Sequence, residues 1–260
     1  MFPIRDDNPQ ILTPYATYAI VALTIAVWVL LQGMGKEPLL SGSICRFGLI
    51  PGELMQLVPS GTRVPLGPAS VCVLADSGSW ITALTAMFMH GGWMHIIGNM
   101  WFLWIFGDNV EDAMGPGRFI VFYLLCGLAA AAFQVMAGPS SQIPMVGASG
   151  AIGGVMGAYV LLYPHVRVHM LFILIFYVTT FAVPAYLMLG YWFLVQLLSG
   201  VATYGGEGGG VAFWAHVGGF LAGALLIFPF RRKELLDRHP NHGWRRRDSA
   251  ARNWRRIDRR

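Results

Sequence analysis

One serine, Ser149, lies in the apolar, glycine-rich stretch VGASGAIGGVMGAY at residues 146–159. A serine is a weak nucleophile that needs a base within hydrogen-bonding reach. His216 is the candidate base, because it is an ionisable residue in the otherwise apolar stretch FWAHVGGFLAG, and such residues within membrane spans are costly and usually functional. The two residues together indicate nucleophilic catalysis by a Ser–His pair.

Small residues accompany both side chains at helical spacing. Gly153 and Gly157 follow Ser149, and Gly219 and Gly223 follow His216. Glycine faces allow two membrane helices to approach closely. Such faces suit any tightly packed helix pair, and here they would also bring the hydroxyl and the imidazole together.

A third polar set lies in FMHGGWMHIIGNMWFLWIFGDN at residues 88–109. His95 and Asn99 are four residues apart and therefore share a helix face, and His90 lies just before them. Asn99 could form an interhelical hydrogen bond. Alternatively, Asn99 and His95 could donate to a developing oxyanion, a contribution of roughly 3 kcal/mol per donor in hydrolases.

The composition indicates a membrane protein, because 55% of the 260 residues are hydrophobic and only 12% are charged, against about 25% charged in soluble domains. The net charge of +5 is uneven. Residues 231–260 contain twelve Lys or Arg and four Asp or Glu, a net charge of +8, which leaves 5 − 8 = −3 for the remainder. Since the basic excess follows the last apolar segment, it indicates membrane topology, with recruitment of anionic lipid as the alternative. No nucleic-acid partner is expected.

Six apolar segments provide, or nearly provide, the roughly 20 residues that a bilayer core requires. They cover residues 15–31, 95–106 with flanks, 119–136, 149–163, 185–199 and 213–230. A further apolar run at 168–183 is rich in β-branched and aromatic residues, and we expect it to be interfacial or re-entrant. Because Lys and Arg near span ends favour the cytoplasm, both termini are expected inside and the long segment 32–80 outside, partly on the membrane.

The segment that begins with Ser149 is short. It has about 15 residues before Pro164, so at 1.5 Å per residue it reaches only part of the way across the bilayer. Ser149 is therefore expected below the outer surface, at a helix N-terminus whose free N–H groups favour an oxyanion. The irregular backbone before it must face protein or water at that depth, which implies a water-filled cavity.

Three cysteines are too few for a disulfide framework. Cys45 and Cys72 share the external segment, and we expect them either to pair, if the segment faces an oxidising compartment, or to be free thiols. Cys126 lies within a span and is expected to be a small buried residue.

Three motifs, HGGWMHIIGNM, GASGAIGG and AHVGG, occur in this order on the second, fourth and sixth expected spans. In this ordered set, over roughly residues 80–225, the chain resembles the rhomboid family of intramembrane serine proteases. The resemblance implies an all-α membrane protein, a six-transmembrane-helix bundle with a long, partly membrane-associated first external loop. We expect a membrane domain at residues 1–230 and a disordered basic cytoplasmic tail at 231–260.

The resemblance also implies a role for each site residue. Ser149 attacks the scissile carbonyl, and His216 accepts its proton and returns it to the leaving amine. The backbone N–H of Ser149 holds the oxyanion together with His95 and Asn99. The other residues implied are Gly147, which allows the substrate backbone to approach, and the structural residues His90, Gly150 and Gly219.

The orientation of His216 is less well defined by the sequence. No Asp or Glu lies near it in the last span, and Glu207 belongs to an outer loop, so we expect packing and Ser149 alone to orient the imidazole. Gly153 stands where some rhomboids have an aromatic residue that stacks on this histidine.

Three further residues receive expectations from the resemblance. Glu111 is expected to cap or brace neighbouring helices. Trp192 and Phe193 are expected either to line the side through which a substrate helix arrives or to face lipid.

Other classes of membrane protein account for fewer of these residues. His165 and His169 are four residues apart, but the chain has no H-E-x-x-H motif, so neither a metal nor another cofactor is expected. A transporter leaves the polar set unexplained, and no inverted repeat is visible. The main alternative is a catalytically silent rhomboid-like protein that binds transmembrane helices, but such relatives typically lack the serine or the histidine.

The expected substrates are single-span membrane proteins with an unstable helix near the outer face. Cleavage requires extended backbone at the serine, and Gly or Pro lowers the cost of unwinding a helix. The expected location is a bacterial plasma membrane, since no organelle-targeting segment precedes the first span.

Overall fold

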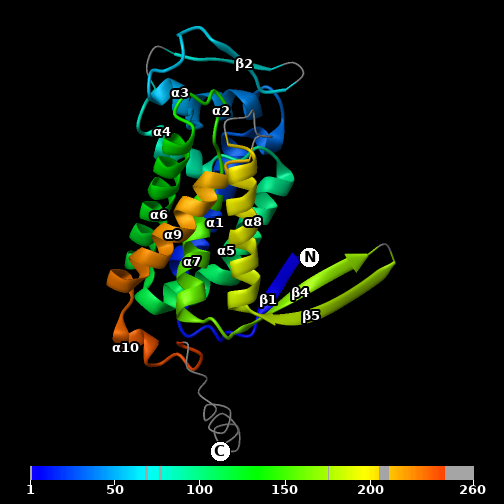
Figure 1. The fold of residues 1–260 in the computed structure, drawn as a ribbon, viewed down its shortest axis with the longest axis vertical. Coiled ribbons are helices and arrows are strands. Elements are labelled where there is room, and N and C mark those ends of the chain that lie inside the picture. Colours follow the sequence, from blue (N-terminus) through cyan, green and yellow to red (C-terminus); the bar gives the residue numbers. More distant parts are fainter. Residues whose placement is uncertain (1, 68–69, 76–77, 175, 205–210, 244–260) are drawn as a thin grey trace, which may run out of the picture.

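The computed structural model describes residues 2–67, 70–75, 78–174, 176–204 and 211–243. The protein is mostly helical (Figure 1). Six longer helices carry the fold: α1 (Tyr15–Leu30), α5 (Trp93–Met114), α6 (Pro116–Ala137), α7 (Ser149–Leu162), α8 (Ala185–Ala202) and α9 (Phe213–Phe230). Each expected span coincides with one of these helices.

Three of these helices, α6, α8 and α9, are long and apolar enough to cross a membrane, and α1 and α7 are shorter apolar helices. The helical arrangement therefore suits a membrane protein. That all six helices cross the bilayer stays a prediction.

The expected helical class holds for most of the chain, but the structure adds two small antiparallel sheets that an all-α class does not include. One has the order β1–β4–β5 and joins β1 (Phe2–Asp6), β4 (Arg167–Leu174) and β5 (Tyr177–Pro184). The other pairs β2 (Arg63–Pro65) with β3 (Val71–Val73). The physical reason is that strand pairing joins segments far apart in the sequence, such as Phe2 and Leu171, which no local pattern reveals.

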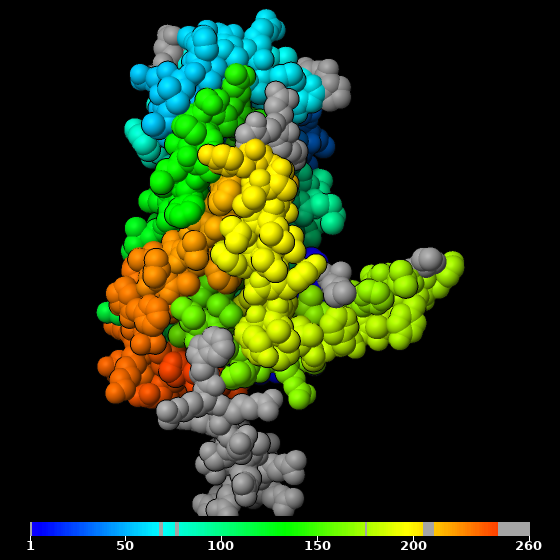
Figure 2. Space-filling view, viewed as in Figure 1, coloured from blue at the N-terminus to red at the C-terminus, as the bar shows by residue number. Residues whose placement is uncertain are grey.

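The apolar run at 168–183 forms the β4–β5 hairpin, which projects sideways from the bundle (Figures 1 and 2). Its β-branched and aromatic side chains favour a pleated strand over a helix. Because the hairpin leads away from the bundle, it suits the interfacial expectation better than the re-entrant one. Its position at a membrane interface stays a prediction.

Glycines allow α7 and α9 to pack with their backbones in contact. A side-chain carbon on Gly219 would collide with the carbonyl of Gly150, and one on Gly223 would collide with the carbonyl of Gly154. We call this contact of four glycines the glycine seam. All of α7 from Gly150 to Tyr159 is buried, so the seam lies in the middle of the protein.

Two acidic residues near the C-terminal end of α5 hold the start of α1. Glu111 accepts hydrogen bonds from the backbone N–H groups of Ala16 and Thr17 at 3.0 and 2.8 Å. Asp112 accepts from the N–H groups of residues 11–12, both at 2.7 Å. Carboxylates satisfy the otherwise unpaired donors of a helix N-terminus. The bracing role expected of Glu111 is confirmed.

The segment between α1 and α5 consists of short elements. In chain order these are η1 (Gly33–Gly35), α2 (Leu39–Phe47) and α3 (Pro51–Leu54), then strands β2 and β3, then α4 (Thr82–Thr85) and η2 (Ala86–Phe88). They form a cap at one end of the bundle (Figure 1).

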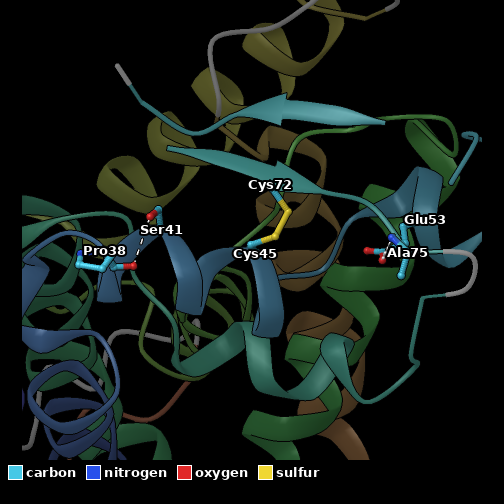
Figure 3. Close-up of a disulfide and its surroundings, with 6 residues drawn as sticks. All are labelled: Pro38, Ser41, Cys45, Glu53, Cys72 and Ala75. Atoms are coloured by element: carbon cyan, nitrogen blue, oxygen red, sulfur yellow. Dashed lines mark hydrogen bonds between the residues drawn. A yellow bond between two sulfur atoms is a disulfide. The ribbon is translucent and has the colours of Figure 1, made fainter. Parts of the chain in front are cut away.

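A disulfide between Cys45 of α2 and Cys72 of β3 ties the cap together (Figure 3). Of the two states expected for these cysteines, the structure has the pair. Beside it, the Glu53 carboxylate accepts a hydrogen bond from the N–H of Ala75 at 2.9 Å. Cys126 is free and buried, as expected.

The first part of the basic tail is ordered, unlike the disordered tail expected from the sequence. Residues 231–243 include α10 (Lys233–Leu236). Backbone N–H groups of this segment donate to the carbonyls of Ala113 and Leu162, both at 2.8 Å. These carbonyls lie in the last turns of α5 and α7, where helices lack internal donors. Residues 244–260 lie outside the described chain.

Candidate active site

The structure brings Ser149 and His216 together. Ser149 is the first residue of α7, and His216 lies in the first turn of α9. The Ser149 Oγ lies 2.7 Å from His216 Nε2, within hydrogen-bonding distance. The glycine seam explains this proximity, because the contact between Gly150 and Gly219 begins one residue after the serine and three after the histidine.

The other ring nitrogen of His216 also has a partner. Nδ1 lies 2.7 Å from Oε1 of Gln196, on α8. The expectation that packing and Ser149 alone orient the ring is therefore wrong. A signal for Gln196 was present, because it is an amide side chain in an apolar helix, and polar side chains in membrane spans usually have a function.

Trp192 lies against His216, and its predicted place beside an arriving substrate helix or lipid stays a prediction. The two ring centroids are 5.8 Å apart and the planes are tilted by 38°. A side-chain carbon on Gly153 would lie 3.7 Å from the Trp192 ring and 3.1 Å from the His216 carbonyl oxygen. The glycine therefore leaves room for an aromatic ring that comes from another helix. Phe193 packs on Phe220 of α9, with ring centroids 4.7 Å apart.

His95 and Asn99 face the backbone that precedes the serine. Gly147 has a φ of +125°, a conformation that favours glycine. A side-chain carbon there would lie 2.7 Å from His95 Nε2 and 3.6 Å from Asn99 Nδ2. Thus α5, α9 and the segment that precedes α7 meet around the N-terminus of α7.

The hydrogen bonds around His95 and Asn99 show which of their side-chain atoms can donate. His95 Nδ1 accepts from the N–H of Gly91 at 3.2 Å, so in the neutral ring Nε2 carries the proton. Asn99 is buried, and its Nδ2 has no hydrogen-bond partner among the described residues. An interhelical hydrogen bond from this amide nitrogen is therefore not observed, and two N–H donors remain near Gly147.

The chain also matches known proteins over the residues that form this site. The Rhomboid domain family matches residues 77–233. The chain belongs to the rhomboid family. The resemblance expected from the three motifs is thereby confirmed.

Curated relatives support the same assignment. Rhomboid protease GluP of Bacillus subtilis (strain 168) is 31% identical over 216 residues, which cover 83% of this rhomboid and 36% of that protein. Rhomboid protein 1, mitochondrial, of Saccharomyces cerevisiae is 29% identical over 153 residues, which cover 56% of this chain and 41% of that protein. The chain spans less than half the length of these two relatives.

In this rhomboid, His90 packs against the site residue His95. Its ring is fully buried and meets the His95 ring edge to face, with centroids 5.1 Å apart. Its backbone N–H and carbonyl both bond to the Gln32 side chain at 2.8 Å. These contacts hold the segment from which α5 begins.

Two small cavities lie around the segment that precedes α7. One of about 20 Å³ is lined by Gly147, Ser149 and Gly150, and another of about 130 Å³ lies among the loop before α7 and the ends of α6, α8 and α9. Met145 and Ala212 line both cavities. The smaller one has room for about one water molecule.

Metal ligation receives no support from the described residues, in which no group of three or more His, Cys, Asp or Glu side chains could hold an ion. His169 lies on β4 beside Asp7, with 2.8 Å between Nε2 and Oδ1, and not on a helix face with His165. His165 follows the C-terminal end of α7, whereas Ser149 begins it. Glu207 lies outside the described residues.

Proposed function

We propose that this rhomboid is an intramembrane serine endopeptidase that uses Ser149 as the nucleophile and His216 as the general base. The observation that carries this proposal is the 2.7 Å contact between Ser149 Oγ and His216 Nε2 at the N-terminus of a buried helix. His216 accepts the serine proton as Oγ attacks the carbonyl carbon, and then gives it to the leaving amine. Water subsequently releases the acyl group by the same proton transfers.

The proposed oxyanion site uses three donors. The N–H of Ser149 lies in the first turn of α7, where backbone donors have no intrahelical partner. His95 Nε2 and Asn99 Nδ2 point toward the adjacent Gly147. Donors held in place before the reaction stabilise the charge that develops on the carbonyl oxygen.

The proposed substrates are transmembrane segments of single-span proteins, cut near the outer face. This depth follows from six crossings with both termini in the cytoplasm, which place the N-terminus of α7 and the cap on the outer side. The Cys45–Cys72 disulfide supports this orientation, because disulfides form in oxidising compartments. We further propose that the protein resides in a bacterial plasma membrane and that its basic tail meets anionic lipid.

The two cavities support the supply of water. Ser149 lines the smaller cavity, the loop before α7 and the ends of three helices line the larger one, and Met145 and Ala212 line both. Irregular backbone such as that of the loop is tolerated at membrane depth only beside protein or water. Hydrolysis at a buried serine requires such a path.

Labelling of the detergent-purified protein with a fluorophosphonate probe tests the proposal. We expect the wild type to be labelled and Ser149→Ala and His216→Ala to be unlabelled, with Ser199→Ala on α8 as a matched serine control that labels normally. Cleavage of a single-span test substrate in liposomes should follow the same order. A folded wild type that neither labels nor cleaves would instead indicate a silent protein that binds transmembrane helices.

A further inference from the structure

We propose that Gln196 is the positioning residue of the dyad and takes the place of the carboxylate that other serine hydrolases use to orient their histidine. The inference rests on the proposed Ser–His chemistry. It concerns a residue of α8 that neither the motifs nor the family resemblance single out.

The geometry determines the direction of both hydrogen bonds of His216. The carbonyl oxygen of an amide can only accept, so His216 Nδ1, 2.7 Å from Gln196 Oε1, must be the N–H donor. A neutral imidazole carries a single N–H, which leaves Nε2 as an acceptor. Nε2 is the atom that lies 2.7 Å from the Ser149 hydroxyl. Gln196 therefore selects the tautomer that can take the serine proton.

No charged group performs this function among the described residues. Asp7 pairs with His169, and among the described residues no ion pair joins an Asp or Glu to His216. His95 of α5 is a titratable group close enough to influence His216 electrostatically. The amide of Gln196 is thus the side chain that contacts the outer nitrogen of the ring.

Trp192 completes the arrangement from the same helix. It lies four residues before Gln196, so both side chains share one face of α8. Gln196 holds the ring at its edge, and Trp192 covers it in the space that Gly153 leaves open. One helix therefore supplies both contacts that restrain the imidazole.

A second glutamine provides a matched control. Gln134 of α6 accepts a hydrogen bond from the backbone N–H of Ala215 at 3.1 Å, next to His216 in the chain. Both glutamines join a neighbouring helix to the start of α9, but only Gln196 touches the imidazole. Gln196→Leu and Gln134→Leu each remove one such bond at similar side-chain size.

The experiment measures kcat, KM and the pH dependence of cleavage of a single-span test substrate for four proteins: the wild type, Gln196→Leu, Gln196→Glu and Gln134→Leu. For Gln196→Leu we expect kcat to fall roughly 10- to 100-fold at unchanged KM, the range found when the outer partner of a metal-binding histidine is removed. Gln196→Glu keeps an acceptor and should recover most of the loss. Because a carboxylate favours the protonated ring, its acid limb should move to higher pH. Gln134→Leu should keep the wild-type pH profile.

A spectroscopic measurement separates this inference from the proposed function. The ¹⁵N shifts of histidine-labelled protein report which ring nitrogen of His216 carries the proton, whether or not the protein cleaves anything. We expect Nδ1–H in the wild type and in Ser149→Ala, and a mixture of tautomers in Gln196→Leu. Wild-type kcat and pH profile in Gln196→Leu, or an Nε2–H ring in the wild type, would overturn the assignment.

Discussion

The glycine seam and α8 contribute to the same site through two different kinds of contact. At the seam, the backbones of α7 and α9 touch, and no side-chain carbon fits between Gly219 and the Gly150 carbonyl. α8 is the least buried of the three long apolar helices, stands at the surface of the bundle (Figure 2), and has open space around Gly190. The rigid contact sets the distance from serine to histidine, whereas the looser helix supplies the groups that orient the ring. Distance and orientation should therefore be separable by mutation.

The largest expected effect breaks the seam. Gly223→Ala places a carbon against the carbonyl of Gly154, where backbone and not a flexible side chain must move, so we expect a loss of about 3 kcal/mol or more of stability. Gly190→Ala on α8 is the matched control and should stay within about 0.5 kcal/mol of the wild type. Thermal unfolding in detergent measures both. Equal stability of the two variants would contradict the rigid seam.

The second prediction concerns α5 and leaves both the glycine seam and α8 unchanged. Asn99→Ala removes one proposed oxyanion donor from α5 and should lower kcat by roughly 10²- to 10³-fold while the protein folds normally. Gly98→Ala, at a neighbouring position with open space, controls for a substitution in this turn of α5 that removes no donor. Turnover of a single-span substrate and the unfolding temperature are measured together. Normal turnover of Asn99→Ala would remove this residue from the oxyanion role.

The third prediction concerns the far end of the bundle, where β1 meets α7. Asp6 accepts a hydrogen bond from the Tyr159 hydroxyl, and burial raises the pKa of its carboxyl from 3.8 to about 6. The folded state thus holds this proton more tightly than the unfolded state, so the contribution of Asp6 to stability falls as the pH rises from about 4 to about 6. The contribution of Asp6 to the free energy of unfolding changes by at most about 1.4 kcal/mol per pH unit.

Asp6→Asn should remove this slope, and unfolding measured between pH 4 and 7 tests it. Asp237→Asn, at an exposed position, controls for the change in net charge. An unchanged difference between wild type and Asp6→Asn across this range would mean that the carboxyl does not titrate there.

The sequence by itself determined the parts of this protein that depend on spacing along one helix. The six helical segments follow from apolar runs of nearly the length that a bilayer requires. The small-residue faces after Ser149 and His216 and the shared face of His95 and Asn99 follow from a period of 3.6 residues, because neighbours on a helix face are three or four positions apart. The structure places these residues together around Gly147. Their roles in catalysis stay predictions.

Only the tertiary structure decided the contacts between distant segments. The strand pairing that joins residues 2–6 to 167–184, the choice of a disulfide for Cys45 and Cys72, and the ordered start of the tail all depend on partners elsewhere in the chain. The same holds for Gln196, which lies on another helix, 20 residues before His216. A polar residue in an apolar helix indicates that its side chain contacts a polar partner. Which residue is the partner depends on how the helices pack, and the spacing of residues along a single helix does not reveal that packing.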